Sequence, residues 1–196
     1  MMRRRSSGLN FYRKKKKISM SIVKEIAHWA FLIFASAFFA TVLVMSVGIK
    51  IGMVGVSMEP KLYNGQEILL NTFHYKLFSP DRGDVIAFLP NGNQNSHYYV
   101  KRVVALPGEK VQIREGRLYI NGVLADEEDQ YDKIAEPGIA ENEITLGQDE
   151  FFVLGDNRNN SEDSRSGNIG PVKRDTITGK AWFHMASRTS GMGFVE

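Results

Sequence analysis

One long apolar run stands near the start of the chain, and short alternating segments follow it. From Ile26 to Ile49 there are 24 residues without Asp, Glu, Lys or Arg. About 20 apolar residues are enough for a helix to cross a bilayer, and the remaining sequence has no second run of this length. We therefore predict a membrane-spanning helix over residues 26–49. Its one titratable side chain, His28, is more typical of an interfacial or packed histidine than of a ligand.

A cleaved signal peptide is the competing interpretation of this run. Ala35-Ser36-Ala37 fits the small-x-small pattern of a cleavage site. Apolar residues nevertheless continue from Phe38 to Met45, whereas the apolar region of a signal peptide normally ends before its cleavage site. The pattern thus favours an uncleaved anchor.

After Gly52 the pattern changes to short β-like segments that are bounded by Gly, Pro, Asn and Asp. The predicted strands cover residues 67–71, 84–89, 98–106, 111–113, 118–120, 151–154 and 176–185. Glu115-Gly116 predicts a hairpin, and Asn121-Gly122 predicts a tight turn toward Val123-Leu124. Residues 126–150 are acidic and weakly periodic, which indicates an excursion or a small subdomain. No amphipathic helix is expected after residue 50.

These elements predict a mainly β protein with one N-terminal transmembrane helix. The spacing of the strands is typical of a barrel-like or sandwich-like antiparallel fold. We divide the chain into a basic tail (1–25), a membrane anchor (26–49) and a β-rich domain (50–196). Within that domain, residues from about 108 to 150 form a small inserted subdomain.

The net charge of +3 averages two unlike parts. Residues 1–24 hold nine Lys and Arg and no acid, whereas residues 51–196 hold 15 Lys and Arg against 21 Asp and Glu. Basic residues beside an apolar span stay in the cytoplasm and contact anionic lipid headgroups. The β-rich domain is then extracytoplasmic, and its acidic balance argues against nucleic-acid binding. The absence of cysteine excludes disulfides and thiolate chemistry.

Several familiar kinds of site are not indicated. The sequence has no H-E-x-x-H motif, no Cys/His cluster and no Gly-rich phosphate loop, so neither a metal nor a cofactor is expected. A Ser-His-Asp triad would need one of the three later histidines, and none of them stands in a recognisable motif: His74, His97 and His184.

The candidate nucleophile is Ser57, just past the apolar run, and it needs another base. Lys101 lies in an almost wholly apolar predicted strand, and Arg102 points to the opposite face because side chains alternate. Burial of a lysine lowers its pKa. A base near neutrality needs a drop of roughly 2–3 units from the reference pKa near 10.4, or roughly 3–4 kcal/mol. Alternation alone leaves open whether Lys101 or Arg102 points inward.

Four blocks occur in a fixed order after the apolar run, namely 55–60 (GVSMEP), 82–88 (RGDVIAF), 99–109 (YVKRVVALPGE) and 155–165 (GDNRNNSEDSR). Together they strongly resemble type I signal peptidases, which are serine/lysine proteases. The single anchor and the short length resemble the Gram-positive bacterial branch. This resemblance extends from the anchor to about Met185.

The resemblance implies a signal-peptidase-like catalytic domain that cleaves secretory preproteins after a small-x-small sequence at the membrane. Ser57 matches the nucleophile and Lys101 the general base, which resolves the ambiguity of alternation. Ser161 matches a serine that hydrogen-bonds and orients the lysine. The charged positions of the last block imply ion pairs that hold the active-site loops together: Asp156, Arg158, Asp163 and Arg165. Met58 is expected to contribute to substrate binding.

Two positions refine this expectation. Some family members carry a serine two residues before the nucleophile, where its hydroxyl stabilises the oxyanion, but here Gly55 has none. The backbone N–H of Ser57 is then the expected hydrogen-bond donor to the oxyanion. Ser57 follows Lys50 by seven residues, which span at most about 25 Å, so it is expected near the outer membrane surface. A self-cleaving regulator and an inactive tethered protein on the same scaffold remain the alternatives.

Overall fold

The computed structural model describes residues 19–93, 96–125, 130–187 and 189–195. The chain divides into two compact units, one that ends at Thr41 and one that begins at Val42. The four acidic residues 126–129 of the predicted excursion lie outside the described residues, as does the basic tail up to residue 18.

The apolar run forms helix α1, Met20–Val47. Its segment Met20–Leu43 is long and apolar enough to cross a membrane. The helix starts before the predicted boundary at residue 26 because Lys24 and Glu25 are good helix formers in spite of their charge. It ends before Gly48, which has a φ of +63° and suits the left-handed conformation common after helices. Ile49, which we placed at the end of the span, begins the first strand instead.

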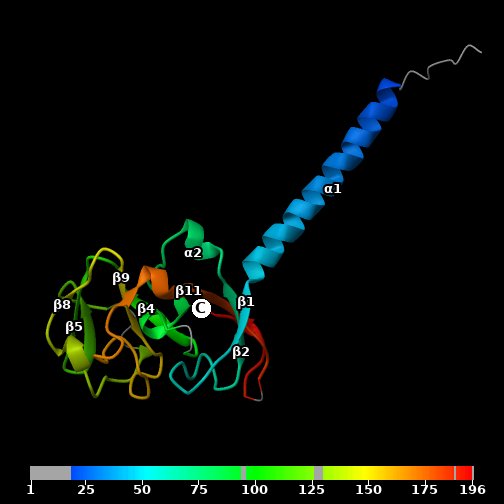
Figure 1. Cartoon of the computed structure of the whole chain (residues 1–196). Coiled ribbons are helices and arrows are strands. Elements are labelled where there is room, and N and C mark those ends of the chain that lie inside the picture. Colours follow the sequence, from blue (N-terminus) through cyan, green and yellow to red (C-terminus); the bar gives the residue numbers. More distant parts are fainter. Residues whose placement is uncertain (1–18, 94–95, 126–129, 188, 196) are drawn as a thin grey trace, which may run out of the picture. The chain divides into compact units, whose positions relative to one another are not determined.

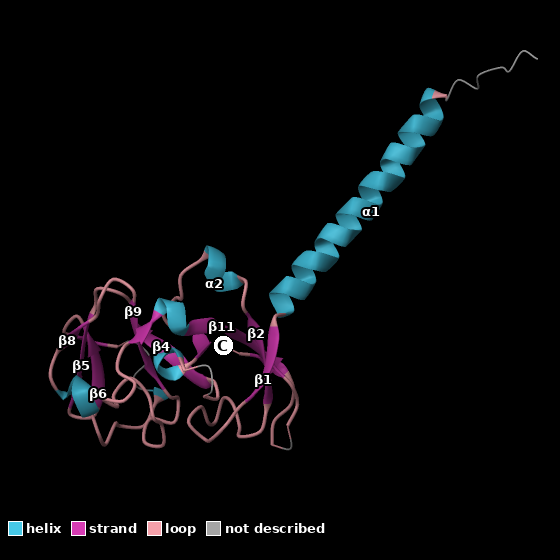
Figure 2. Ribbon diagram, in the orientation of Figure 1, coloured by secondary structure: helices cyan, strands magenta, loops and turns pink. Residues whose placement is uncertain are grey.

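A large antiparallel sheet forms the centre of the second unit (Figures 1 and 2). The strand order is β1-β2-β11-β3-β4-β9-β10, and β12 pairs with β11. The strands are β1 Ile49–Gly52, β2 Glu67–Asn71, β3 Val85–Phe88, β4 Tyr99–Ala105, β9 Glu150–Leu154, β10 Val172–Lys173, β11 Ile177–His184 and β12 Gly193–Phe194.

Both faces of this sheet are covered. On β3, Val85 and Ala87 belong to one apolar cluster, whereas Ile86 and Phe88 belong to another. The six residues from Val100 to Ala105 on the neighbouring strand β4 are all buried. A strand that is buried on both faces reads as a continuous apolar run rather than as an alternating one, which explains the sequence of β4.

A second antiparallel sheet, in the order β7-β6-β5-β8, is inserted between β4 and β9. Its strands are β5 Lys110–Arg114, β6 Arg117–Ile120, β7 Val123–Leu124 and β8 Ile144–Thr145. It lies on the β9 side of the large sheet, away from β1 and β2 (Figure 1). Val111, Ile113 and Leu118 form a core with Phe152 and Leu154 of β9. The mainly β class with a small inserted sheet is thus confirmed.

The predicted hairpin at Glu115-Gly116 is present. Both residues have positive φ, 52° and 78°, and the register pairs Arg114 with Arg117. A two-residue turn with positive φ at both positions matches the right-handed twist of the flanking strands.

The longer predicted strands are confirmed within one or two residues, and the shortest elements were missed. These are β1, β8, β10, β12, the four-residue helix α2 His74–Leu77, and the 3₁₀ turns η1 Pro90–Gly92, η3 Gly138–Glu141 and η4 Arg174–Thr176. Segments of two to four residues carry too little periodicity to be detected, because pairing with distant strands stabilises them.

Candidate active site

Ser57 lies in a turn that follows β1 and is 8% exposed. Two hydrogen bonds tie this turn to the last sequence block: the Asn157 N–H donates to the Ser57 carbonyl at 3.0 Å, and the Asn157 side chain donates to the Val56 carbonyl at 3.3 Å. The Gly55 N–H donates to Asn64 Oδ1 at 2.9 Å. Met58 is fully buried in the core beside the turn, and its role in substrate binding stays a prediction.

Lys101 lies near the middle of β4 and is 4% exposed. Its Nζ atom is hydrogen-bonded to Ser57 Oγ at 2.6 Å. Ile86 of β3 is its neighbour across the sheet, and the Tyr99 ring centroid lies 5.5 Å from Nζ. The two side chains that the sequence singled out, 44 residues apart, are therefore in direct contact.

Burial lowers the pKa of Lys101 from 10.5 to about 8, because the charged ammonium loses its hydration. The carboxylates of Asp163, Glu162 and Asp156 oppose this shift, and the Arg165 guanidinium assists it. With a pKa near 8, about a tenth of the amine is neutral at pH 7. The amine is thus able to accept a proton near neutral pH.

Arg102, the next residue on β4, is also buried. Its guanidinium makes two hydrogen bonds to the Asp156 carboxylate, at 2.8 and 2.7 Å, and one to the Gly83 carbonyl at 2.8 Å. Alternation left open which of Lys101 and Arg102 points inward. Both side chains are buried, because both faces of β4 are covered. A buried charge requires a charged or hydrogen-bonding partner, and Asp156 supplies it for Arg102.

The remaining charged residues of the last block hold that loop together. Asp163 accepts two bonds from the Arg165 guanidinium, at 2.8 and 2.9 Å, and one from the Gly155 N–H at 3.1 Å. Arg165 also donates to the Arg158 carbonyl at 2.6 Å, and the Arg158 guanidinium lies 3.9 Å from the Tyr131 ring centroid. These contacts fix the backbone that carries Asn157 and hence the Ser57 turn.

Ser161 differs from the prediction. Its Oγ atom is buried and makes no hydrogen bond within the described part of the chain, so the expected bond to Lys101 is not formed in this structure. The hydroxyl lies against Gly155, where a Cβ atom would be 2.3 Å from it and 2.5 Å from the Ser57 carbonyl oxygen. Arg165 donates to the Ser161 carbonyl at 3.4 Å, and among the described residues Lys101 Nζ is hydrogen-bonded to Ser57 Oγ.

Gly55 has a φ of +85°. A Cβ atom at this position would meet nothing within 4 Å, so backbone conformation rather than crowding favours glycine here. The Ser57 backbone N–H donates no hydrogen bond to any residue that the structure describes.

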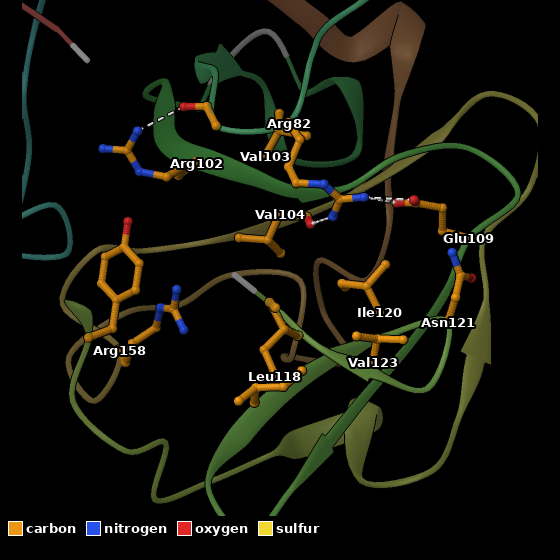
Figure 3. Close-up of a pocket in the computed structure, with 14 residues that line it drawn as sticks. Arg82, Arg102, Val103, Val104, Glu109, Leu118, Ile120, Asn121, Val123 and Arg158 are labelled. Carbon is orange, nitrogen blue, oxygen red and sulfur yellow. Dashed lines mark hydrogen bonds and ion pairs between the residues drawn. The ribbon is translucent and has the colours of Figure 1, made fainter. Parts of the chain in front are cut away.

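A cavity of about 370 Å³ lies between β4 and the second sheet, and neither Ser57 nor Lys101 lines it. Figure 3 shows Leu118, Ile120 and Val123 on one side and Arg82, bonded to Glu109 and to the Val104 carbonyl, on the other. The cavity is therefore separate from the contact between Ser57 and Lys101.

Three functionally placed residues were absent from the predicted site: Arg102, Asn157 and Asn64. Arg102 could have been found from the sequence. Two adjacent charged residues in an otherwise apolar strand point to opposite faces, and each needs a partner if both faces are buried. Asn157 and Asn64 act through backbone groups of the Ser57 turn, and no local pattern indicates such long-range bonds. Among the described residues, no group of three His, Asp or Glu side chains is arranged to hold a metal ion.

In this site a serine hydroxyl contacts a buried lysine amine. The arrangement is typical of serine hydrolases in which a lysine, rather than a histidine, is the base. The family model for signal peptidase, peptidase S26, matches residues 26–186. The chain therefore belongs to the signal peptidase I family of peptidases.

Two curated relatives agree with this assignment. The probable signal peptidase I-2 of Synechocystis sp. is 33% identical over 153 residues, which cover 72% of this chain and 67% of that protein. Signal peptidase I S of Bacillus subtilis is 30% identical over 179 residues, which cover 86% and 93%. A crystal structure of a signal peptidase I from Enterococcus faecalis is 32% identical and covers 53% of this chain and 97% of its own, with a TM-score of 0.39.

Proposed function

We propose that this protein is a membrane-bound serine endopeptidase that removes signal peptides from secretory preproteins after a small-x-small sequence. Ser57 is the nucleophile and Lys101 the general base. The observation that carries this proposal is the 2.6 Å contact between Lys101 Nζ and Ser57 Oγ, at a buried site where the lysine pKa falls to about 8. The family assignment independently supports a peptidase.

In the first half of the reaction, neutral Lys101 accepts the Ser57 proton while Ser57 Oγ attacks the scissile carbonyl carbon. The tetrahedral intermediate collapses to an acyl-enzyme as the lysine ammonium returns this proton to the leaving amine. Water then attacks the ester while Lys101 accepts one of its protons, and the lysine ammonium passes this proton to Ser57 Oγ as the ester bond breaks. The cleaved signal peptide leaves as a carboxylic acid, which loses its proton to the solvent.

In this proposal, the backbone N–H of Ser57 is the donor that stabilises the oxyanion. It has no partner among the described residues, and Asn157 holds the Ser57 carbonyl and so fixes the plane of this turn. One such donor contributes roughly 2.7–4 kcal/mol to transition-state stabilisation. Gly55 leaves open space beside this position, which a bound substrate or water can occupy.

The exposed apolar residues Val54 and Val56 flank the serine turn, and they suit a shallow apolar surface that favours small substrate side chains. A substrate in extended conformation would gain backbone hydrogen bonds at a strand edge, while alternate side chains provide specificity.

Helix α1 anchors the enzyme in the phospholipid membrane, with the basic tail in the cytoplasm and the peptidase domain outside. The candidate span Met20–Leu43 supports this placement, as does the excess of nine basic residues before residue 25. The proposed reaction uses no cofactor, and nucleic acid is not among the proposed partners.

The decisive experiment compares Ser57→Ala and Lys101→Ala with the unsubstituted chain, solubilised in detergent and incubated with a preprotein. Each substitution is expected to abolish processing, whereas Lys110→Ala, at an exposed lysine that pairs with Glu143, is expected to leave it unchanged. Undiminished cleavage by either dyad variant would rule out this dyad.

The same assay separates the alternatives. A self-cleaving regulator would cut its own chain and leave the preprotein intact. An inactive tethered protein would cut neither.

A further inference from the structure

We propose that helix α2 is a second membrane contact, which inserts Leu77 and Phe78 into the lipid–water interface and thereby sets the height of the dyad. The proposal rests on the membrane location given under the proposed function. It concerns an element that none of the four sequence blocks contains.

Leu77 and Phe78 are adjacent and are 64% and 58% exposed. Leu77 is the last residue of α2, and Phe78 caps the helix by donating its N–H to the His74 carbonyl at 2.9 Å. The Phe78 ring lies 5.2 Å from the His74 ring. Two large apolar side chains side by side in water are unfavourable, which indicates a partner that removes them from it.

The helix that presents these residues is firmly mounted. The Arg174 guanidinium donates to the carbonyls of Tyr75 and Phe78, at 2.9 and 2.8 Å. On the other side, the Tyr75 hydroxyl donates to Asp84 at 2.8 Å, and Asp84 also pairs with Lys180 of β11. Because α2 is joined to both β3 and β11 through these bonds, its exposed tip has little freedom to fold back onto the domain.

The strand register places α2 at the sheet end where the chain leaves the apolar helix. Ile49 pairs with Leu70, and Gly48 lies so close that a Cβ atom there would be 2.0 Å from the Leu70 carbonyl oxygen. The chain reaches α2 only three residues after Asn71. The beginning of β1 and the beginning of α2 thus lie at the same edge of the fold.

The same register connects α2 to the dyad. Lys101 pairs with Ile86, Ile86 with Lys180, and Lys180 with Asn71. These residues form one row across four neighbouring strands. At about 4.8 Å between strands, the row places Asn71 roughly 14 Å from Lys101. A membrane contact just beyond Asn71 therefore holds the catalytic lysine at a defined level.

The chemistry of the tip fits a phospholipid bilayer better than a protein partner. Aromatic and aliphatic side chains beside a lysine, here Lys76, are typical of interfacial segments in which the ammonium reaches the headgroups. A stable protein interface buries about 800 Å² on each partner, and two side chains provide far less than that.

The chain has no cysteine, so single cysteines report membrane depth without a background. We suggest labelling Leu77→Cys, Phe78→Cys and Val123→Cys in the full chain with an environment-sensitive fluorophore. The labelled proteins are placed in phosphatidylcholine/phosphatidylglycerol nanodiscs that carry brominated acyl chains. Val123 is the matched control, because it is apolar, 67% exposed and on the second sheet.

Labels at 77 and 78 are expected to be quenched at least twice as strongly as the label at 123. If labels at 77 and 78 are quenched no more strongly than the label at 123, the proposal is overturned. This holds also if a protein, rather than lipid, covers the exposed end of α2. Phe34→Cys, within the apolar helix, reports separately whether that helix is inserted.

A functional measurement uses the double variant Leu77→Asn/Phe78→Asn and the control Val123→Asn. For a preprotein in the same bilayer, the double variant is expected to lower kcat/KM about tenfold, because interfacial binding scales with buried apolar area. Cleavage of a water-soluble peptide is expected to stay unchanged, and the control is expected to affect neither substrate.

An equal loss on both substrates would show damage to the domain instead and would contradict the proposal. If the unsubstituted chain cleaves neither substrate, the proposed peptidase function fails. The quenching measurement does not depend on cleavage and still decides whether α2 contacts the membrane.

Discussion

At the scale of single residues, the site depends on a lysine that is buried deeply enough for its pKa to fall to about 8 and that lies close enough to the Ser57 hydroxyl to accept its proton. Lys101 and Ser57 come from distant parts of the sequence, yet their polar atoms are 2.6 Å apart. Burial lowers the lysine pKa to about 8, although three carboxylates oppose the shift. Desolvation therefore outweighs the local negative charge.

The pH dependence of the reaction follows from this pKa. Because the base must be neutral, kcat/KM is expected to rise about tenfold per pH unit below pH 8 and to level off above it. Steady-state cleavage of a soluble peptide between pH 6 and 9.5 provides the measurement. A flat profile over this range would argue against lysine as the base.

The same pKa predicts a stability change in Lys101→Met. The folded-state pKa lies below the unfolded value of 10.5, so the unfolded chain binds the proton more tightly, and folding stability rises as pH increases from about 8 to 10.5. Below pH 8 the charged lysine costs the fold about 3 kcal/mol.

Met has a similar volume and no charge, so the variant is expected to unfold at a higher temperature at pH 6–7 while losing activity. Thermal unfolding in detergent at pH 7 and pH 10.5 should show this gain shrinking at the higher pH. A variant that is less stable than the unsubstituted chain at pH 7 would mean that the lysine contributes more through its contacts than it costs through burial.

At the scale of elements, β4 joins two kinds of buried charge. One face carries Lys101 toward Ser57, and the other carries Arg102 toward Asp156, with both members of that ion pair almost fully shielded from solvent. The Arg102–Asp156 pair connects β4 to the loop that fixes the Ser57 turn through Asn157. The catalytic geometry is thus supported from the far side of the strand.

Replacing one member of this ion pair is expected to destabilise the fold more than replacing both members by apolar residues. Asp156→Asn removes the carboxylate that accepts two hydrogen bonds from the buried Arg102 guanidinium, which we expect to lower the free energy of unfolding by about 3–5 kcal/mol. The double variant Arg102→Met/Asp156→Leu should recover much of this loss, since it removes both charges of the pair. Denaturant unfolding of both variants gives the comparison, and strictly additive losses would refute it.

The sequence anticipated the elements that carry a regular pattern. The alternation in 67–71, the apolar run of β4 and the Glu115-Gly116 turn each arise from neighbouring residues, so they were visible without a fold. The strands β1, β10 and β12 were not visible, because two to four residues form a strand only when a partner from elsewhere in the chain pairs with them. Helix α2 was missed for the same reason, since Arg174 and Asp84 stabilise it from distant positions.

At the scale of the whole molecule, the chain combines an apolar helix, a large sheet with both faces covered and an inserted second sheet. The proposed function requires that the helix cross the membrane with the basic tail inside. The lack of cysteine makes this orientation straightforward to measure.

A single Val123→Cys, exposed on β7, is expected to react with a membrane-impermeant maleimide on intact bacterial cells. Replacing the eight basic residues between Arg3 and Lys17 by Gln removes most of the charge that sets the orientation. We expect labelling to fall at least twofold as part of the population inverts. Unchanged labelling would show that the basic tail does not determine the topology.

The sequence by itself determined the apolar helix and the mainly β class with an inserted subdomain, and it singled out Ser57 and Lys101 as the candidate dyad. Helix length and strand periodicity are local properties, and the two residues stand in distinctive blocks. Only the tertiary structure decided that Lys101 and Arg102 are both buried, on opposite faces of β4, because burial depends on what covers each side of a sheet. It also placed the Ser161 hydroxyl against Gly155 without a hydrogen-bond partner among the described residues. It brought Asn71, just before α2, into the row of Lys101, since pairing of strands distant in sequence decides which residues share a row.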